Sequence, residues 1–141
     1  MYYVSFGEDM SRHRCGKVAV VCENAGALLR YAAALNDLGY FTLSLCGSAS
    51  ELIGLFKTGK QFEYVIFDGF DLGVDAEIMK QIVGCATITS IITVSDVNSI
   101  ERKGVFLWAK QNKIPLLGVL QAPLRLSELQ PLMGREMLFA I

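Results

Sequence analysis

Five short apolar runs in this chain alternate with segments whose apolar residues recur at helical spacing. The expected strands are Val18–Val21, Phe41–Cys46, Tyr64–Phe67, Ser90–Val94 and Leu116–Leu120. Strands that alternate with helices predict a parallel sheet covered by helices on both faces, because a helix joins each strand to the next. The crossovers in such a sheet are expected to be right-handed.

The segments between the runs carry helix signals at their ends. The first helix is expected to end at Gly39, a residue typical of helix C-termini. Ser48 and Glu51 have the spacing of a capping box, which predicts the start of the second helix. The later helices are expected over Val74–Val83, over Ser99–Asn112 and from Ser127 onward, with Pro131 in the first turn of the last one.

The length and composition predict one domain. We expect residues 1–16, which lack periodicity and hold the only histidine, to form an N-terminal tail, and residues 17–141 to form the domain. The chain is 52% hydrophobic, yet no uninterrupted apolar run approaches the roughly 20 residues of a membrane helix. The apolar excess is therefore expected in buried strands or on a partner-facing surface.

Charge and cysteine usage exclude several functions. The net charge is -1 and no basic block is present, which argues against direct binding of nucleic acid. The four cysteines form no CxxC pair and no zinc-ligand spacing, so we expect reduced thiols in a cytoplasmic protein. These are Cys15, Cys22, Cys46 and Cys85.

Polar residues stand where the expected strands end. Glu23 follows the first strand, Asp68 the third and Ser95 the fourth. In a flavodoxin-like sheet of order 2-1-3-4-5 these strands are neighbours, so the three side chains are expected to converge. Two carboxylates around one pocket are oxygen ligands suited to Mg²⁺, and the hydroxyl could donate to an added phosphoryl oxygen. Each residue also has a plainer interpretation: Asp68 a hydrogen-bonded relic of the fold, Glu23 a solvated acid and Ser95 a strand-end cap.

The chain resembles the receiver domains of two-component response regulators over roughly residues 17–137. The resemblance is carried by Val20-Val21-Cys22-Glu23-Asn24, Leu38-Gly39-Tyr40, Tyr64-Val65-Ile66-Phe67-Asp68, Ile92-Thr93-Val94-Ser95 and Val119-Leu120-Gln121-Ala122-Pro123. It implies a CheY-like three-layer sandwich with Asp68 as phosphoacceptor and Ser95 as switch hydroxyl. Glu23, Asp68 and the Phe70 carbonyl would be the Mg²⁺ ligands. The resemblance also implies a cis peptide bond before Pro123.

The departures from this family concern the charged groups. Cys22 replaces the first acid of the family's acidic pair, and Ala122 replaces the lysine that contacts the phosphoryl group. Val119 stands where the family has an aromatic switch residue, and Phe70-Asp71-Leu72-Gly73 replaces the usual loop after the aspartate. Loss of an acid and of a cation weakens the stabilisation of a metal and of a phosphoryl group. The sequence therefore predicts a divergent receiver domain, not an enzyme, in which phosphorylation is impaired and signalling works by packing against partners.

Two other functions stay open from the sequence. One is an active phosphoacceptor phosphorylated on Asp68 by a sensor histidine kinase or a phosphotransfer protein. The other is a flavodoxin-like domain that binds a small ligand, although no glycine-rich phosphate loop follows the first strand.

The partners follow from the resemblance and the apolar surface. We expect an attached or separate output domain. The apolar stretch 137–141 suggests either that the chain is part of a longer protein or that its last helix docks elsewhere, and the plainer alternative is a last helix that packs on its own sheet. A homodimer is expected through the face formed by the fourth helix, fifth strand and fifth helix, which includes Phe106, Leu107 and Trp108.

Overall fold

The structure is a computed structural model that describes residues 16–87 and 89–133. It contains a five-stranded sheet of order β2-β1-β3-β4-β5, in which every neighbouring pair is parallel. The strands are β1 (Lys17–Val21), β2 (Thr42–Cys46), β3 (Tyr64–Asp68), β4 (Ser90–Ser95) and β5 (Leu116–Gln121). The helices are α2 (Ala25–Asp37), α3 (Ala49–Lys57), α4 (Leu72–Cys85), α5 (Ser99–Gln111) and α6 (Leu126–Met133). The predicted fold class and strand order are confirmed, whereas the expected tail with His13 lies outside the described residues.

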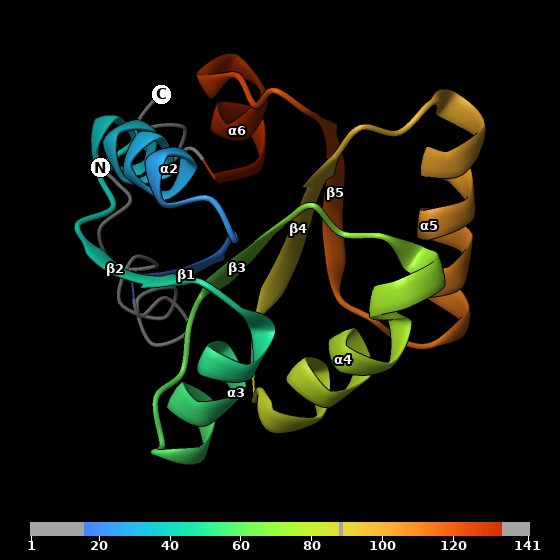
Figure 1. The fold of residues 1–141 in the computed structure, drawn as a ribbon, viewed down its shortest axis with the longest axis horizontal. Helices are drawn as coiled ribbons and strands as arrows, with labels where there is room; N and C mark the ends of the chain where they lie inside the picture. The colour runs from blue at the N-terminus through green and yellow to red at the C-terminus, as the bar shows by residue number, and fades with distance from the viewer. Residues whose placement is uncertain (1–15, 88, 134–141) are drawn as a thin grey trace, which may run out of the picture.

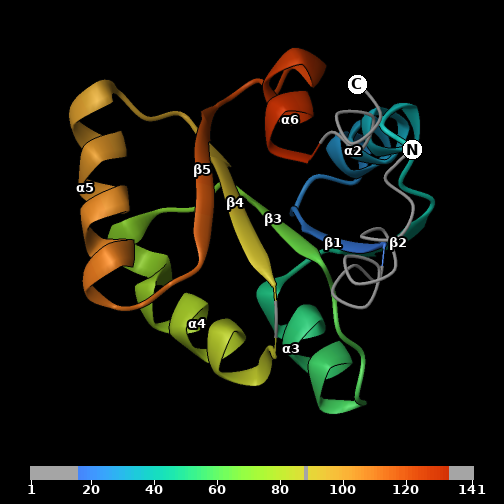
Figure 2. The same ribbon diagram turned by 180° about the vertical axis from the view of Figure 1, so that it is seen from behind.

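Three layers make up the domain. Helices α2 and α6 cover one face of the sheet, and α3, α4 and α5 cover the other (Figure 1 and Figure 2). Successive strand residues point to opposite faces, so Ile66 and Ile92 pack under α2 and α6, whereas Val65 and Ile91 pack under α3 and α4. Both faces of the central strands are therefore buried, which explains the apolar runs.

Several predicted boundaries are wrong. Helix α4 begins at Leu72, two residues before the predicted Val74, because the Asp71 carboxylate accepts a hydrogen bond from the Gly73 amide at 3.0 Å and caps the helix. Helix α6 begins at Leu126, so Pro131 lies in the helix interior and not in its first turn. Strand β2 begins at Thr42, after Phe41.

The strands extend one residue further toward the site than predicted. Asp68, Ser95 and Gln121 are the last residues of β3, β4 and β5, so the sheet ladder holds their backbones. Gly69 follows at φ +77°, a left-handed conformation that favours glycine, and the chain turns away directly after Asp68. The Ala122–Pro123 peptide bond is cis, as the resemblance implies.

Within the part of the chain that the structure describes, no helix has the length and apolarity needed to cross a membrane.

Candidate functional site

Strand register brings Cys22 and Asp68 together. Val21 of β1 is the partner of Phe67 of β3, so the next residues on the two strands are adjacent. Asp68 in turn is the partner of Val94, directly before Ser95. The loop after β5 begins at Ala122, whose backbone amide donates to the Ser95 carbonyl oxygen at 3.0 Å and so ties this loop to the end of β4. The carboxyl ends of β1, β3, β4 and β5 thus meet around Asp68.

Both oxygens of the half-buried Asp68 carboxylate accept hydrogen bonds from uncharged donors. The Tyr31 hydroxyl of α2 donates to Oδ1 at 2.6 Å, and the Cys22 thiol donates to Oδ2 at 3.2 Å. Tyr31 and Cys22 are buried, with 5% and 1% of their surfaces exposed. A phenol that donates to a carboxylate makes one of the stronger hydrogen bonds in proteins, so this contact fixes the position of Asp68 relative to α2.

Burial holds the buried thiols and the phenol in their neutral forms. Burial raises the pKa of Tyr31, and its hydrogen bond to Asp68 raises it further. Burial also raises the pKa of Cys22, an effect that the backbone contact with Asn24 partly opposes and the neighbouring Asp68 reinforces. The pKa of Cys46, at the end of β2, is raised by burial to about 11. These groups are therefore hydrogen-bond donors and apolar packing groups at neutral pH and not nucleophiles.

Alkaline pH is expected to destabilise the domain. A folded-state pKa above the unfolded value means that the unfolded chain loses the proton first, so stability is complete below the unfolded pKa and falls as pH rises toward the folded pKa. For Cys46, whose folded pKa is about 11, the loss at pH 11 should be about 2 kcal/mol relative to pH 8. Denaturant unfolding between pH 8 and pH 11 measures this loss, and Cys46→Ala should make the free energy of unfolding less dependent on pH. The same pH dependence in that variant would show that Cys46 does not cause the loss.

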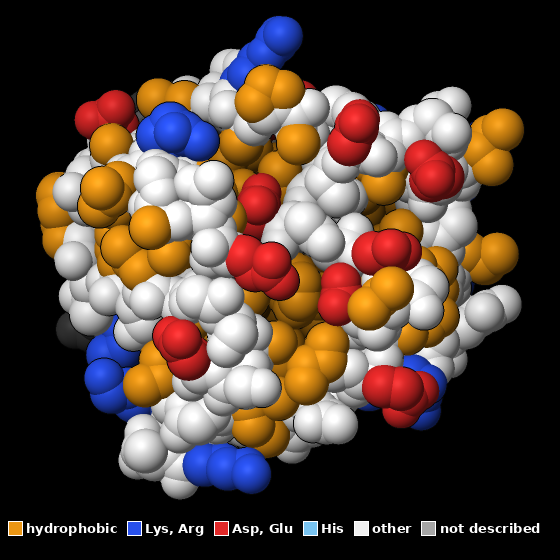
Figure 3. Space-filling model, viewed as in Figure 1, with side chains coloured by type: hydrophobic (Ala, Val, Ile, Leu, Met, Phe, Trp, Pro, Cys, Tyr) orange, Lys and Arg blue, Asp and Glu red, His pale blue; other side chains and the backbone are white. Residues whose placement is uncertain are grey.

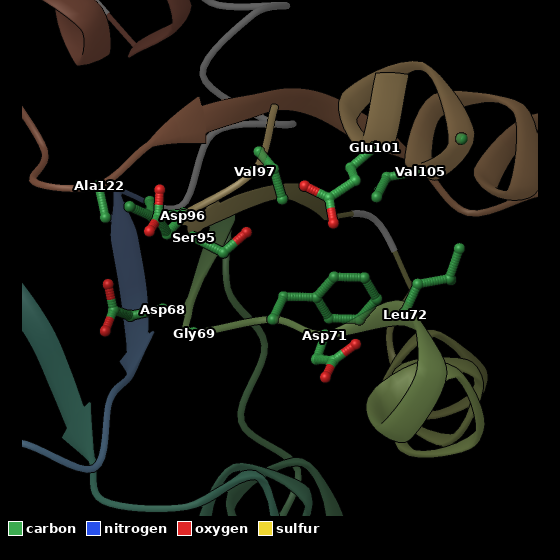
Figure 4. Close-up of a pocket in the computed structure, with 13 residues that line it drawn as sticks. Asp68, Gly69, Asp71, Leu72, Ser95, Asp96, Val97, Glu101, Val105 and Ala122 are labelled. Atoms are coloured by element: carbon green, nitrogen blue, oxygen red, sulfur yellow. The ribbon is translucent and has the colours of Figure 1, made fainter. Parts of the chain in front are cut away.

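An acidic cleft of about 540 Å³ lies between the ends of β3 and β4 and the start of α5. Four carboxylates line it, from Asp68, Asp71, Asp96 and Glu101. Figure 3 shows acidic side chains concentrated near the middle of this face, with hydrophobic side chains exposed between them. In Figure 4 the Asp68 carboxylate points away from Asp71 and lies on the side that Ala122 borders. Asp68 thus reaches only one end of the acidic cleft.

The aromatic residues below the acidic cleft fix its floor. Phe70 is buried and stacks edge-on against Phe67, with ring centroids 5.5 Å apart. The Trp108 ring of α5 also contacts Phe70, with ring centroids 5.9 Å apart. Trp108 is therefore half-buried against the core, whereas its neighbours Phe106 and Leu107 are 42% and 58% exposed on the helix surface.

A second cleft, the α2–α6 cleft, has a volume of about 350 Å³ and also reaches Asp68. Helix α2 contributes Arg30 and Tyr31 to its lining, and the loop before α6 contributes Ala122, Pro123 and Leu124. Asp68 and Ala122 line both clefts, so a lysine at position 122 would project between them. Among the described residues, Arg30 is the one basic side chain that lines either cleft.

The predicted Mg²⁺ ligands do not form a ready metal site. Across residues 16–87 and 89–133, no group of three or more His, Cys, Asp or Glu side chains could hold a metal ion. Glu23 is exposed after β1 and is not among the lining residues of either cleft, whereas Cys22 contacts Asp68. A thiol is a poor ligand for Mg²⁺, which prefers oxygen. The assignment of Glu23, Asp68 and the Phe70 carbonyl as Mg²⁺ ligands stays a prediction.

Tyr31 is the partner of Asp68 that the sequence analysis missed. Its signal is its position on the apolar face of α2, three residues after Leu28 and four before Leu35. A tyrosine at a core position needs a partner for its hydroxyl, because an unpaired buried hydroxyl is costly. That partner is Asp68, the only predicted phosphoacceptor.

The comparisons with known proteins support the fold. No protein-family description matches the sequence, and neither does any curated protein. Solved structures do match. CheY4, a chemotaxis protein of Vibrio cholerae, is 20% identical at a TM-score of 0.63, over 82% of this chain and 97% of that protein. A protein of Burkholderia pseudomallei described as pilus assembly-related is 20% identical at a TM-score of 0.64, over 82% of this chain and 84% of that one.

A third match contains the chemistry that the resemblance implies. It is a response regulator protein of Burkholderia pseudomallei with a phosphorylated aspartic acid, a calcium ion and citrate. It is 16% identical at a TM-score of 0.65, over 85% of this chain and 67% of that one. At such identities these likenesses establish the fold: this chain has the CheY-like fold of receiver domains, with a divergent sequence.

Proposed function

We propose that this chain is a divergent receiver domain that acts as a regulatory signal-transduction and protein-interaction module, with phosphorylation of Asp68 impaired. The observation that carries this proposal is the pairing of both Asp68 oxygens with the chain's own neutral donors, Tyr31 and Cys22. A phosphoryl donor or a cation would have to compete with these contacts. The domain is proposed to be non-enzymatic and cytoplasmic, with no direct contact to nucleic acid or membrane.

Missing charges support the same proposal. Transfer to a carboxylate needs positioned cations to offset the charge of the phosphoryl oxygens, and such groups are often the largest catalytic contribution. Ala122 supplies none, and Cys22 supplies a thiol in place of a metal-binding acid. Signalling is proposed to pass instead through packing against an attached or separate output domain.

Beryllofluoride with Mg²⁺ tests the proposal, because it mimics an aspartyl phosphate. We expect little or no change in the amide NMR signals around Asp68 and Ser95 of the wild-type domain. Asp68→Asn is the matched control, since it keeps the side-chain shape and removes the acceptor. A tight, saturable response in the wild type that Asp68→Asn abolishes would instead identify an active phosphoacceptor, with a histidine kinase or a phosphotransfer protein as its donor.

The α2–α6 cleft favours a second candidate function, the binding of a small ligand. It combines a guanidinium from Arg30 with apolar walls from Pro123 and Leu124, and its volume suits a small organic molecule. Ligand thermal shifts would test this function, because a ligand that binds the folded state raises the melting temperature.

Self-association is expected through the face formed by α5, β5 and α6. Leu107 of α5, Leu117 of β5 and Leu126 of α6 are 58%, 38% and 38% exposed. Apolar patches of this kind usually mark interfaces, and the net charge of -1 gives little repulsion. We therefore expect a homodimer at micromolar concentration.

Sedimentation velocity over a concentration series measures this association. Leu107→Asp should shift the equilibrium to monomer, whereas Val74→Asp, at a 76% exposed position on α4, should not. A single monomeric species at high concentration would defeat the dimer. Leu138, a further candidate contact, lies outside the described residues.

A further inference from the structure

Tyr31 joins the site to one helix layer. Its hydroxyl lies 2.6 Å from Asp68 Oδ1, while its ring packs in the core cluster shared by α2 and α6, together with Leu35 and Leu129. One side chain thus contacts the carboxylate with its polar tip and the α2–α6 layer with its body. Among the hydrogen bonds of the described residues, no other contact runs from Asp68 to a helix.

Other routes from Asp68 into a helix layer are weaker. Cys22, the residue directly after β1, contacts Asp68 through the longer and softer thiol hydrogen bond, and its own amide donates to the Cys46 carbonyl oxygen of β2 at 2.9 Å. Val119 of β5 packs on the opposite face, in the cluster under α3, α4 and α5, and its side chain has no polar atom. It therefore cannot respond to a change in charge at Asp68 by exchanging a hydrogen bond.

We propose that Tyr31 is the residue that transmits the charge state of Asp68 to α2 and to the α2–α6 cleft. An ionised Asp68 holds the hydroxyl through a charge-assisted hydrogen bond, which is roughly twice as strong as a neutral one. This hydrogen bond is weakened when Asp68 is neutralised, and it is lost when another group occupies Oδ1. The hydroxyl then turns toward the α2–α6 cleft, which Tyr31 already lines, and α2 adjusts with it.

This role of Tyr31 rests on the signalling function proposed above, and it specifies the side chain through which a change at Asp68 reaches a helix. The route leads to the α2–α6 side of the sheet, away from the exposed apolar side chains of α5. It also works for any input that alters the charge of Asp68, such as a bound cation, a ligand in the α2–α6 cleft or a covalent group.

Amide NMR of the wild type, Asp68→Asn, Tyr31→Phe and the double variant tests the route without metal or phosphoryl donor. Asp68→Asn removes the charge, and Tyr31→Phe removes the hydroxyl while the ring stays. We expect Asp68→Asn alone to shift the amide signals of α2, and to shift them by at most about a third as much when Tyr31→Phe is already present, because the charge-assisted contact is then absent. Shifts at Gly69 and Val94, beside the substituted residue, should be equal in both backgrounds.

Tyr40→Phe is the matched control, because Tyr40 is also buried and its hydroxyl donates to the Met133 carbonyl oxygen at 2.7 Å. In that background Asp68→Asn should shift α2 as it does in the wild type. Asp68→Ala, which removes the acceptor altogether, should shift α2 more than Asp68→Asn. Equal α2 shifts with and without the Tyr31 hydroxyl, or no α2 shift in any background, would overturn the proposal. The beryllofluoride test uses the wild type and does not depend on Tyr31. Failure of the Tyr31 proposal can therefore be distinguished from failure of the proposed signalling function.

Discussion

Cys22→Asp and Ala122→Lys together are expected to raise the Mg²⁺-dependent phosphorylation of Asp68 by acetyl phosphate roughly 10²-fold or more. The first substitution adds a carboxylate beside Asp68, where the thiol now lies 3.2 Å from Oδ2, and so supplies a second anionic oxygen ligand for Mg²⁺. The second adds a cation at the position where the two clefts meet. Intact mass spectrometry of the base-labile acyl phosphate measures the product.

Metal dependence of stability provides a second readout for the same variant. Without metal, the new carboxylate at position 22 repels Asp68 in a largely buried site and should lower the melting temperature. Mg²⁺ should restore it in the double variant and have little effect on the wild type, because only a state that binds the ion is stabilised by it.

The controls separate restored chemistry from added charge. Asp68→Asn in the double variant should abolish the product, and Ala33→Lys, at an exposed position on α2, should not replace Ala122→Lys. A folded double variant that gains no phosphorylation would contradict the view that the two missing charges limit phosphorylation of Asp68. Wild-type protein that is phosphorylated as fast as the double variant would also contradict it.

The fold could be predicted from the sequence because its signal is repeated. Strands such as Val18–Val21 and Ser90–Val94 are apolar throughout, which is typical of strands buried on both faces, and each is followed by a helical pattern. Errors occurred where one local contact decides the outcome. The Asp71 cap adds two residues to α4, and the placement of Pro131 depends on where α6 begins.

The site was only partly predictable. The convergence of Asp68 and Ser95 at one edge follows from strand order, and the structure places both along the acidic cleft. The Cys22–Asp68 contact also follows once the register is known. The Tyr31–Asp68 contact does not, because it depends on how closely α2 packs against the sheet, and sequence spacing carries no information on that distance. Glu23, which the sequence grouped with Asp68, is exposed, and the preceding residue Cys22 contacts Asp68 instead.

Ile92→Ala is expected to lower the free energy of unfolding by about 2–5 kcal/mol. Ile92 lies in β4 with none of its surface exposed, in the cluster under α2 and α6 that also contains Tyr31. Its neighbours in the sheet are Ile66 on one side and Gly118 on the other. Denaturant unfolding monitored by circular dichroism measures the loss, which should appear at constant m-value if the compactness of both states is unchanged.

The upper part of that range is expected because the space left by Ile92 cannot close easily. Gly118 has no side chain to move into it, and Leu132 of α6 already covers Gly118 so closely that a Cβ there would lie 2.7 Å from its Cδ1 atom. The residual cavity, and not only the lost transfer free energy, therefore adds to the cost. Ile100→Ala is the matched control: the same atoms are removed at a position that is 79% exposed on α5, where a change within about 0.5 kcal/mol is expected. Equal losses for the two variants would mean that Ile92 is not part of a packed core, and would weaken the placement of Tyr31 in the same cluster.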